Sequence, residues 1–399
     1  MGTARPSLQI DDARLAQRVQ LFPESVIREM TRVALEHGAI NLAQGFPDFD
    51  PPEGVKDAAK RAIDEGRNQY AITWGTRELR EAITQKARRF NGIEADPEKN
   101  VVVTCGSTEA VMATMLALID PGDEAIVFEP FYENYGPDAI ISGARARFVP
   151  MRADWTLDEE ALKAAFTAKT KVLILNTPNN PTGRVLTRRE LQVIADLCED
   201  RGAVAVTDEI YEHIVYDGRR HVSLATLGSM GERTVTINAL SKTYSATGWR
   251  VGWCIAPDTI TAGIRRVHDF LTVGAAHPLQ VAGAVALGLG DDYYAELASS
   301  YERRRDALCE ALARLGFRLA IPEGAYYVMA DFTEISGEDD WSFAMRLARE
   351  ARVAVVPGSS FYDGPAGGRA MVRFLFCKKD ETLREAVRRL EAWREGRAR

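Results

Sequence analysis

The chain has 399 residues, of which 46% are hydrophobic and 27% charged, so it can bury a large core and its length suggests two domains or more. Its net charge of -7 argues against a nucleic-acid-binding protein, because affinity for phosphate backbones comes mainly from clustered Lys and Arg. No segment is apolar enough to span a bilayer, and residues 1–12 contain no apolar stretch of the signal-peptide type, so we expect a cytoplasmic protein. The five cysteines lie far apart, with no C-x-x-C pair and no histidine at metal-ligand spacing, so neither disulfides nor a structural metal site is expected.

The first patterned segment, residues 22–37, has apolar residues at helical spacing and is followed by Gly38, a typical left-handed cap. We expect an extended segment over 40–50, in which Gly45 would let a ligand approach the backbone. A helix is predicted over 53–65, and Thr76 is expected to cap the next helix after an aromatic loop that contains Tyr70. Aromatic residues in such loops pack more often than they contact ligands, so the pattern alone does not favour a role for Tyr70.

From residue 101 onward, strands and helices alternate, which predicts a mainly parallel sheet with helices on its faces. Ligands bind such open sheets at the carboxyl ends of the strands, so the residues that end each strand are the candidates for a site. The predicted strands cover residues 101–103, 125–128, 171–175, 203–207, 234–237 and 251–256.

Several of these strand ends carry polar groups. Ser107 and Thr108 lie where the free backbone N–H groups of a helix begin, which makes an anion site. A rigid polar turn over 176–183 precedes a helix that a capping box over 187–190 opens. Asp208 and Glu209 end the next strand, and Lys242 ends the one after it. Each feature has an ordinary explanation, such as a helix cap or a surface lysine, but their occurrence at successive strand ends favours one shared site.

A long amphipathic helix is predicted over 293–315, and a smaller α/β unit is predicted from residue 316 onward. Its expected strands are 325–331, 353–356 and 371–377, and its expected helices are 341–351 and 381–394. Arg373 lies inside the last of these apolar strands. An unpaired buried charge costs several kcal/mol, so Arg373 needs a partner, either an internal carboxylate or a substrate carboxylate.

A lysine amine, an anion site, a carboxylate and a carboxylate-binding arginine together match what pyridoxal phosphate requires. The motifs Ser-Lys-Thr-Tyr-Ser-Ala-Thr-Gly-Trp-Arg-Val-Gly at 241–252, Asn-Asn-Pro-Thr-Gly at 179–183 and Asp-Glu-Ile-Tyr at 208–211 resemble those of the class I/II aminotransferases of fold type I. The resemblance extends over nearly the whole chain. It implies an α/β fold with a large domain over 51–290, which holds a mainly parallel, doubly wound sheet, and a small α/β domain built from 1–50 and 291–399.

The resemblance also implies roles for individual residues around the cofactor ring. Lys242 would be the Schiff-base lysine and would then carry the proton that moves during transamination. Asp208 would pair with the pyridine nitrogen. Tyr211 and Asn180 would bind the ring 3-oxygen, and Tyr132 would stack on the ring.

Further implied residues bind the cofactor phosphate and the substrate. Those for the phosphate are Gly106, Ser107, Thr108 and Arg250. Tyr70 would reach the phosphate of a neighbouring subunit, so the resemblance implies a homodimer with shared active sites. Arg373 would bind the substrate α-carboxylate, aided by Gly45 and Asn180. One position departs from the family pattern, because Ala239 stands where many members have a phosphate-binding serine, and Ser241 is the candidate replacement.

Aspartate-type members carry an arginine for the second carboxylate in the segment that corresponds to 271–278 here, and this chain has none there. The segment Gln-Gly-Phe-Pro-Asp-Phe at 44–49, with Phe22, Trp74 and Tyr132, is more similar to the kynurenine, methionine and aromatic amino acid aminotransferases. We therefore predict a neutral or aromatic L-amino acid as donor and 2-oxoglutarate or another 2-oxo acid as acceptor.

Several alternatives stay open at this stage. They are an aspartate-type aminotransferase and a different pyridoxal phosphate reaction on the same fold, such as carbon–sulfur β-elimination or oxidative deamination. A cofactor-sensing transcriptional regulator is disfavoured, because only about forty residues precede the first site segment, too few for a DNA-binding unit and a linker.

Overall fold

The computed structural model describes residues 14–364 and 366–397. Residues 1–12, for which no signal peptide was expected, lie outside the described residues. The larger sheet has seven strands in the order β2-β8-β7-β6-β5-β3-β4. Strand β8 runs antiparallel to β2 and β7, and the other pairs are parallel, which confirms the mainly parallel sheet. The strands are β2 (Val101–Thr104), β3 (Glu124–Glu129), β4 (Arg145–Pro150), β5 (Thr170–Asn176), β6 (Val204–Asp208), β7 (Thr234–Ala239) and β8 (Gly252–Ile255).

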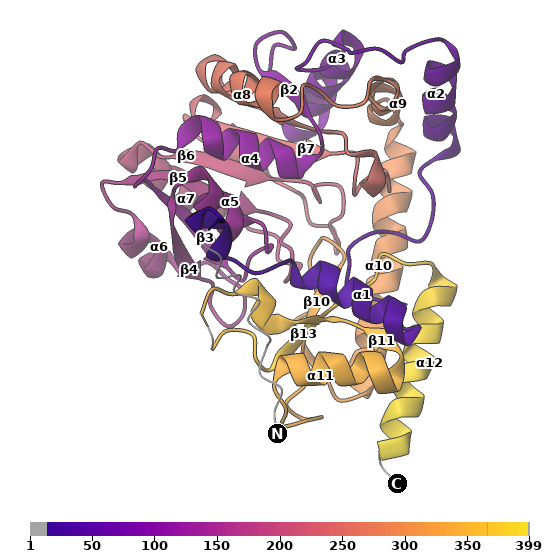
Figure 1. The fold of residues 1–399 in the computed structure, drawn as a ribbon. Helices are drawn as coiled ribbons and strands as arrows, with labels where there is room; N and C mark the ends of the chain where they lie inside the picture. Colours follow the sequence, from indigo (N-terminus) through magenta and orange to yellow (C-terminus); the bar gives the residue numbers. More distant parts are fainter. Residues whose placement is uncertain (1–13, 365, 398–399) are drawn as a thin grey trace.

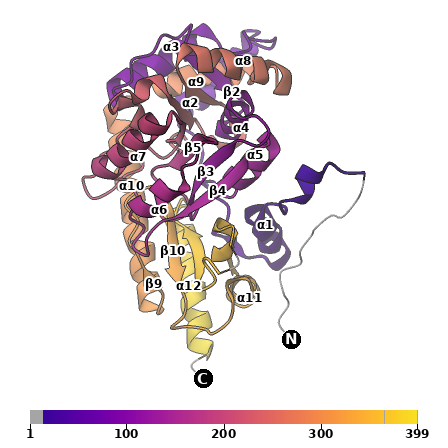
Figure 2. The ribbon, with the colours of Figure 1, turned by 90° about the vertical axis from the view of Figure 1, so that its left-hand side faces the viewer.

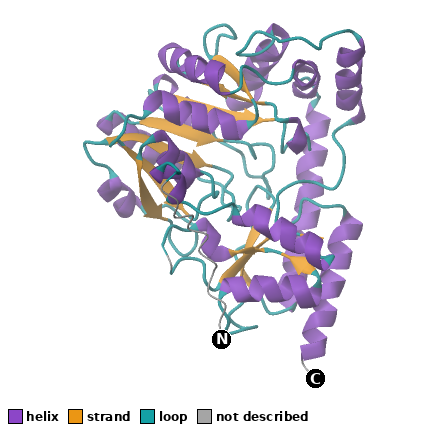
Figure 3. Cartoon of the chain, in the orientation of Figure 1, coloured by secondary structure: helices purple, strands orange, loops and turns teal. Residues whose placement is uncertain are grey.

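Helices cover both faces of this sheet, as expected for a doubly wound fold (Figures 1 and 3). Along β5, Val172 and Ile174 face one helical layer while Leu173 and Leu175 face the other, because successive side chains of a strand point to opposite sides. The first layer consists of α4 (Ser107–Leu118), α5 (Tyr135–Ser142) and α8 (Asp258–Leu271). Two groups of helices cover the opposite face of the sheet. One group consists of α6 (Glu159–Ala165) and α7 (Arg188–Arg201), and the other of α2 (Glu53–Asp64), α3 (Arg77–Lys86) and α9 (His277–Leu287).

The remaining strands form two small sheets. One has four antiparallel strands in the order β12 (Val356–Pro357), β13 (Met371–Leu375), β10 (Tyr327–Asp331) and β9 (Arg318–Leu319). In the other, β1 (Ile40–Asn41) pairs in parallel with β11 (Val353–Ala354), so an N-terminal strand lies beside the C-terminal part. The helices packed around these strands are α1 (Val26–His37), α11 (Asp340–Arg346) and α12 (Asp380–Arg397).

Helix α10 (Asp291–Arg314) runs along one side of the molecule, from the layer that holds the large sheet to the layer that holds the small one (Figures 1 and 2). Short helical turns complete the described structure. They are η1 (Gln17–Gln20), η2 (Ala87–Asn91), η3 (Leu224–Thr226), η4 (Met230–Glu232), η5 (Thr247–Trp249), η6 (Leu347–Ala351) and η7 (Gly358–Phe361).

The helix caps follow the sequence signals closely. Helix α1 ends at Gly38, which is left-handed with φ 57°, but it begins at residue 26 rather than 22 because the Ser25 side chain caps it. Thr76 caps α3 through the backbone N–H of Leu79, and the capping box of Thr187 and Glu190 opens α7. In the described part of the chain, none of the helices combines the length and apolar character needed to cross a membrane.

Candidate active site

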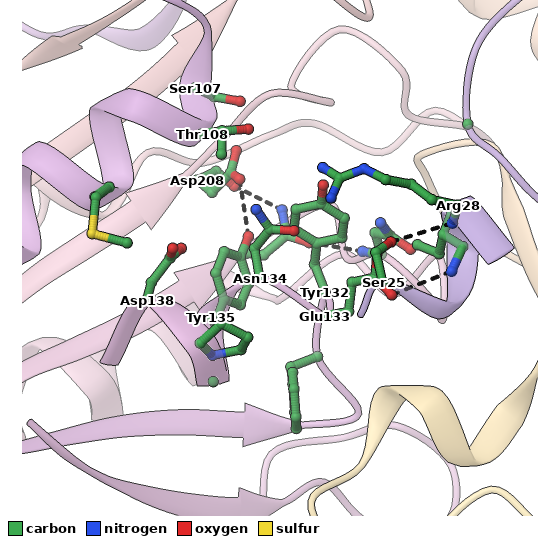
Figure 4. Close-up of a pocket in the computed structure, with 18 of the residues that line it drawn as sticks. Ser25, Arg28, Ser107, Thr108, Tyr132, Glu133, Asn134, Tyr135, Asp138 and Asp208 are labelled. Carbon is green, nitrogen blue, oxygen red and sulfur yellow. Dashed lines mark hydrogen bonds between the residues drawn. The ribbon is translucent and has the colours of Figure 1, made fainter. Parts of the chain in front are cut away.

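A cavity of about 1190 Å³ lies at the carboxyl ends of β5, β6 and β7, and the N-terminal turn of α1 borders it on the other side (Figure 4). This position is where open α/β sheets bind ligands. The predicted site residues that line the cavity are Gly45, Ser107, Thr108, Tyr132, Asn180, Asp208, Tyr211, Ser241, Lys242 and Arg250. The strand-end residues identified in the sequence therefore do converge on one site.

Lys242 follows the end of β7, and its Nζ donates a hydrogen bond to the carbonyl oxygen of Gly45, 2.9 Å away. Burial lowers the pKa of Lys242 to about 8; Cys377 and Asp208 oppose this effect in part, whereas the positive charges of Arg250 and Arg373 add to it. A close backbone approach requires a glycine at position 45, since a Cβ there would lie 1.9 Å from the Tyr327 hydroxyl. The amine is thus held in the cavity and is easier to deprotonate than an ordinary lysine.

Asp208 ends β6 and is almost fully buried. Burial raises the pKa of Asp208 to about 6, and hydrogen bonds from Tyr135 Oη (2.9 Å) and the Ile210 N–H (3.2 Å) oppose that rise. The carboxylate is therefore anionic at neutral pH. The adjacent acid, Glu209, does not line the cavity and instead contacts His221 Nε2 at 2.8 Å.

Arg373 lies in β13, directly behind the lining residues Asn180 and Tyr327, and is fully buried. Its Nη1 donates to Asn180 Oδ1 at 2.7 Å, its Nη2 donates to the Ala43 carbonyl, and its guanidinium lies 4.3 Å from the centroid of the Tyr327 ring. In residues 14–364 and 366–397, no carboxylate forms an ion pair with Arg373, and its Nε is buried without a hydrogen-bond partner. The internal-carboxylate alternative is therefore wrong for the described residues, in which Arg373 donates hydrogen bonds to an amide oxygen and a backbone carbonyl.

The aromatic side chains of the site pack against one another. Tyr211 Oη lies 3.0 Å from Tyr327 Oη, within hydrogen-bond distance. The ring centroid of Tyr132 lies 5.7 Å from that of Tyr135, in an edge-to-face arrangement. Tyr70 is 88% exposed and does not line this cavity, so within one chain it is apart from the other predicted residues.

The loop before α4 and the turn after β7 meet at the predicted anion site. Gly106 has φ 83°, and a Cβ on it would lie 2.2 Å from Arg250 Nη2, so the guanidinium packs directly on the glycine backbone. Ser107 and Thr108 line the cavity at the N-terminus of α4, and within the described chain their side chains have no hydrogen-bond partner. Free hydroxyls, helix N–H groups and a guanidinium are the groups that bind a phosphate.

The departure from the family motif is visible in the structure. Ala239 is the last residue of β7 and is fully buried, so no side-chain donor reaches the anion site from there. Ser241 lines the cavity, and its hydroxyl makes no hydrogen bond within the described residues. Ser241 is thus free to bind a ligand, as the sequence analysis considered.

Several residues at the site carry no signal in the recognised motifs. Tyr135 and Asp138 lie on α5, which was not predicted, and Arg28 and Glu133 lie at the contact between α1 and the cavity. Glu133 accepts hydrogen bonds from the Ser25 hydroxyl and the Ile27 N–H at the start of α1, and Figure 4 shows Glu133 beside Ser25. The segment 132–134 begins four residues after the end of the predicted strand over 125–128, and this position near a strand end was the one signal that could have pointed to it.

The donor set fits pyridoxal phosphate. The free hydroxyls and the guanidinium suit a phosphate dianion, the buried anion of Asp208 suits a cationic ring nitrogen, and the lowered pKa of Lys242 suits imine formation with an aldehyde. The cavity also exceeds the usual range for small-ligand sites of about 300–1,000 Å³, which leaves room for a substrate beside the cofactor.

Comparisons with known proteins agree with this chemistry. Residues 37–390 match the family model described as aminotransferase class I and II. The chain is 41% identical to a probable N-succinyldiaminopimelate aminotransferase of Mycobacterium tuberculosis, covering 94% of this chain and 97% of the relative. It is 36% identical to a kynurenine–oxoglutarate transaminase of Dictyostelium discoideum (93% and 94% covered) and to a methionine aminotransferase of Escherichia coli (92% and 95% covered). The solved N-succinyldiaminopimelate aminotransferase of M. tuberculosis superposes with a TM-score of 0.93 at 40% identity, covering 95% of this chain and 100% of that one.

Proposed function

This chain belongs to the class I and II aminotransferases, which are pyridoxal phosphate-dependent enzymes of fold type I, and we propose how its own residues carry out the transfer. One observation supports the proposal. Lys242, Asp208 and the anion site at Gly106 and Arg250, called the phosphate cradle below, meet at one cavity, and Arg373 lies directly behind its wall. The reaction moves the α-amino group of an L-amino acid to a 2-oxo acid.

When bound, the cofactor supplies an aldehyde that receives the amino group and a ring that withdraws electrons from the substrate Cα. We assign the proton transfer to Lys242, whose Nζ would take the Cα proton of the donor amino acid and, in the second half of the cycle, would donate a proton to the Cα derived from the 2-oxo acid. Its lowered pKa of about 8 keeps a useful fraction of the amine neutral near neutral pH. Such positioned proton transfer typically contributes about 10² to 10⁴-fold in rate.

Asp208 is proposed to keep the ring nitrogen cationic, because a buried carboxylate stabilises a nearby positive charge strongly. We expect Tyr211 and the amide of Asn180 to bind the ring 3-oxygen and Tyr132 to cover the ring face. Ser107, Thr108, Ser241 and Arg250, with the backbone at Gly106, would hold the phosphate; all four side chains line the cavity, and none of their hydroxyls has a protein partner in the described chain.

Arg373 is proposed to bind the substrate α-carboxylate as a bidentate fork, with Asn180 and the Gly45 backbone beside it. The orphaned Nε supports this role, because a buried donor without a partner is costly unless a ligand satisfies it. Since Arg373 is fully buried, a lining side chain such as Tyr327 must move aside to admit the carboxylate.

We propose a homodimer in which Tyr70 completes the partner's phosphate site. Tyr70 is 88% exposed, and exposed apolar side chains at Ile72, Phe270, Leu271 and Val273 accompany it. The two segments that carry these residues lie together, since Thr73 O contacts His268 Nε2 at 2.8 Å. Covering such a patch is favourable because it removes apolar surface from water.

For the substrate we propose a neutral or aromatic L-amino acid, because apolar side chains from Leu21, Phe22, Phe46 and Tyr132 line the cavity. Trp74 does not line it; the Arg265 guanidinium lies 4.8 Å from its ring. Single-turnover rates with Asp, Met, Phe and kynurenine test this choice, and the fastest turnover with Asp would reject it. Conversion of the bound cofactor to its aminated form, detected by mass after release, distinguishes transamination from elimination or oxidative deamination.

A second candidate substrate class is an amino acid or 2-oxo acid with a carboxylate at the far end of its side chain. Arg28 favours it, because this exposed cation lines the cavity and no side chain in the described structure pairs with it. The nearby acid Glu133 binds the start of α1 instead (Figure 4). In an Arg28→Gln variant, a rise in KM for 2-oxoglutarate with no change for a neutral 2-oxo acid would support this class, and equal KM values would remove it.

A further inference from the structure

Asp138 is a second buried carboxyl group that lines the cavity next to Asp208. It lies in the first turns of α5, is only 4% exposed, and lines the same cavity as Tyr135 and Asp208. Figure 4 shows its carboxyl group pointing toward the end of the Tyr135 ring where Asp208 lies. The sequence analysis gave Asp138 no role, and the family chemistry described above does not use it.

The carboxyl group of Asp138 is unsatisfied. Its Oδ2 is buried and has no hydrogen-bond partner, and none of the described residues donates to its side chain. An isolated buried carboxylate is strongly unfavourable, so such a group stays protonated unless a cation neutralises it. Burial raises the pKa of Asp138 to about 8, and the negative charge of Asp208 adds to the rise.

Asp208 is the one charged group in the described structure that contributes to the raised pKa of Asp138, and Tyr132 and Tyr135 are the other titratable groups close to it. The elements packed against α5 are α4, β3, β4 and η1. Their charged residues face other partners or solvent: Glu109 contacts His268, Arg147 pairs with Glu124, Glu129 accepts from the Asp363 N–H, and Arg145 and Arg18 are exposed. No cation is therefore placed to neutralise Asp138.

We propose that Asp138 is a positioning residue for Asp208. In its neutral form it leaves Asp208 as the single negative charge at the base of the cavity, and in its ionised form it adds a second negative charge that strengthens the hold of Asp208 on a cationic ligand nitrogen. The effect of Asp138 on catalysis rests on the proposed function. The electrostatic coupling between the carboxyl groups of Asp138 and Asp208 does not require the cofactor.

The coupling is tested first in cofactor-free protein, by NMR titration of ¹³C-labelled aspartate carboxyl groups. We expect one resonance that titrates near pH 8 in the wild type and is lost in Asp138→Asn. In Asp208→Asn the same resonance should titrate at a lower pH, because a like charge has been removed. A resonance that does not move in Asp208→Asn would overturn the coupling, and this arm leaves position 138 intact.

The catalytic consequence is tested in the holoenzyme by pH titration of the cofactor absorbance. The wild-type curve should require one more ionisation near pH 8 than the Asp138→Asn curve. Asp196→Asn, an exposed site on α7, should behave as the wild type in both titrations. Identical absorbance titration curves for the wild type and Asp138→Asn would overturn the proposal. A wild-type protein that binds no cofactor would instead overturn the proposed function, and the NMR titration would then decide whether the two carboxyl groups are coupled.

Discussion

The phenol of Tyr135 donates a 2.9 Å hydrogen bond to Oδ2 of Asp208 and is the only side chain in the described structure that donates to this carboxylate. The bond opposes the effect of burial, which by itself would favour the protonated acid. A residue outside the recognised motifs thus helps to keep Asp208 anionic beneath the cavity.

Tyr135→Phe should therefore raise the pKa of Asp208 above about 6 and weaken cofactor binding. Hydrogen bonds to charged groups are worth about 1.5–3 kcal/mol, so we expect the Kd for pyridoxal phosphate to rise on the order of tenfold. Tyr293→Phe removes a phenol that binds the Thr243 carbonyl outside the cavity, and it serves as the matched control in the same absorbance titration. Equal Kd values for the two variants would contradict the role of Tyr135.

Arg373→Lys should lower kcat/KM for amino acids by about 30-fold or more, because an ammonium cannot form the bidentate pair with a carboxylate. The Kd for the cofactor should stay within about threefold, since Arg373 does not line the cavity. Steady-state rates with an amine that lacks the carboxylate provide the control, and they should differ little between the two enzymes. A similar loss with both substrates would show that Arg373 acts on structure rather than on the carboxylate.

Gly106→Ala should disturb the phosphate cradle, because the added Cβ would lie 2.2 Å from Arg250 Nη2 at a residue with φ 83°. We expect the Kd for pyridoxal phosphate to rise on the order of tenfold, and the weak binding of pyridoxal without phosphate to change little. Gly122→Ala introduces the same methyl group at φ 99° with no atom within 4 Å, which controls for backbone strain. If the two variants bind the cofactor equally well, the cradle is not at Gly106.

The pKa of Lys242 makes capture of the cofactor pH-dependent. Only the neutral amine attacks an aldehyde, so with a pKa of about 8 the capture rate of cofactor-free enzyme should rise about fivefold from pH 7 to pH 8 and level off above pH 9. The sign follows from the lowered pKa, because an ordinary lysine would still be gaining reactivity near pH 10. Stopped-flow absorbance measures the rate, and a continued rise to pH 10 would contradict the buried environment of Lys242.

Much of the fold follows from local pattern. The buried strand β5 contains a continuous apolar run, β7 is rich in β-branched residues, and caps such as Thr76 and Gly38 mark their helices directly. Strand β4 was missed because it is a half-exposed edge strand that contains two arginines, and α5 was missed because it is short. The division into 51–290 and 1–50 with 291–399 stays a prediction.

The site was predictable where a motif marks a strand end, as at Asp208 and Lys242. Contacts between distant segments were not, because they depend on tertiary packing. The pairing of Arg373 with Asn180, the approach of Gly45 to Lys242 and the placement of Asp138 near Asp208 each join residues far apart in the chain. Such contacts also decide between the alternatives that the sequence leaves open. For Arg373 the alternatives were an internal carboxylate and a substrate carboxylate, and no carboxylate among the described residues pairs with it.

The central claim is that Lys242 carries pyridoxal phosphate as an imine while Asp208 holds its ring nitrogen. The most direct test is the visible absorbance spectrum of purified protein saturated with pyridoxal phosphate, recorded for the wild type and for Lys242→Ala. The account predicts an imine band in the wild type that survives gel filtration and is missing in the variant. A band of equal intensity in Lys242→Ala, or no band in the wild type, would contradict it.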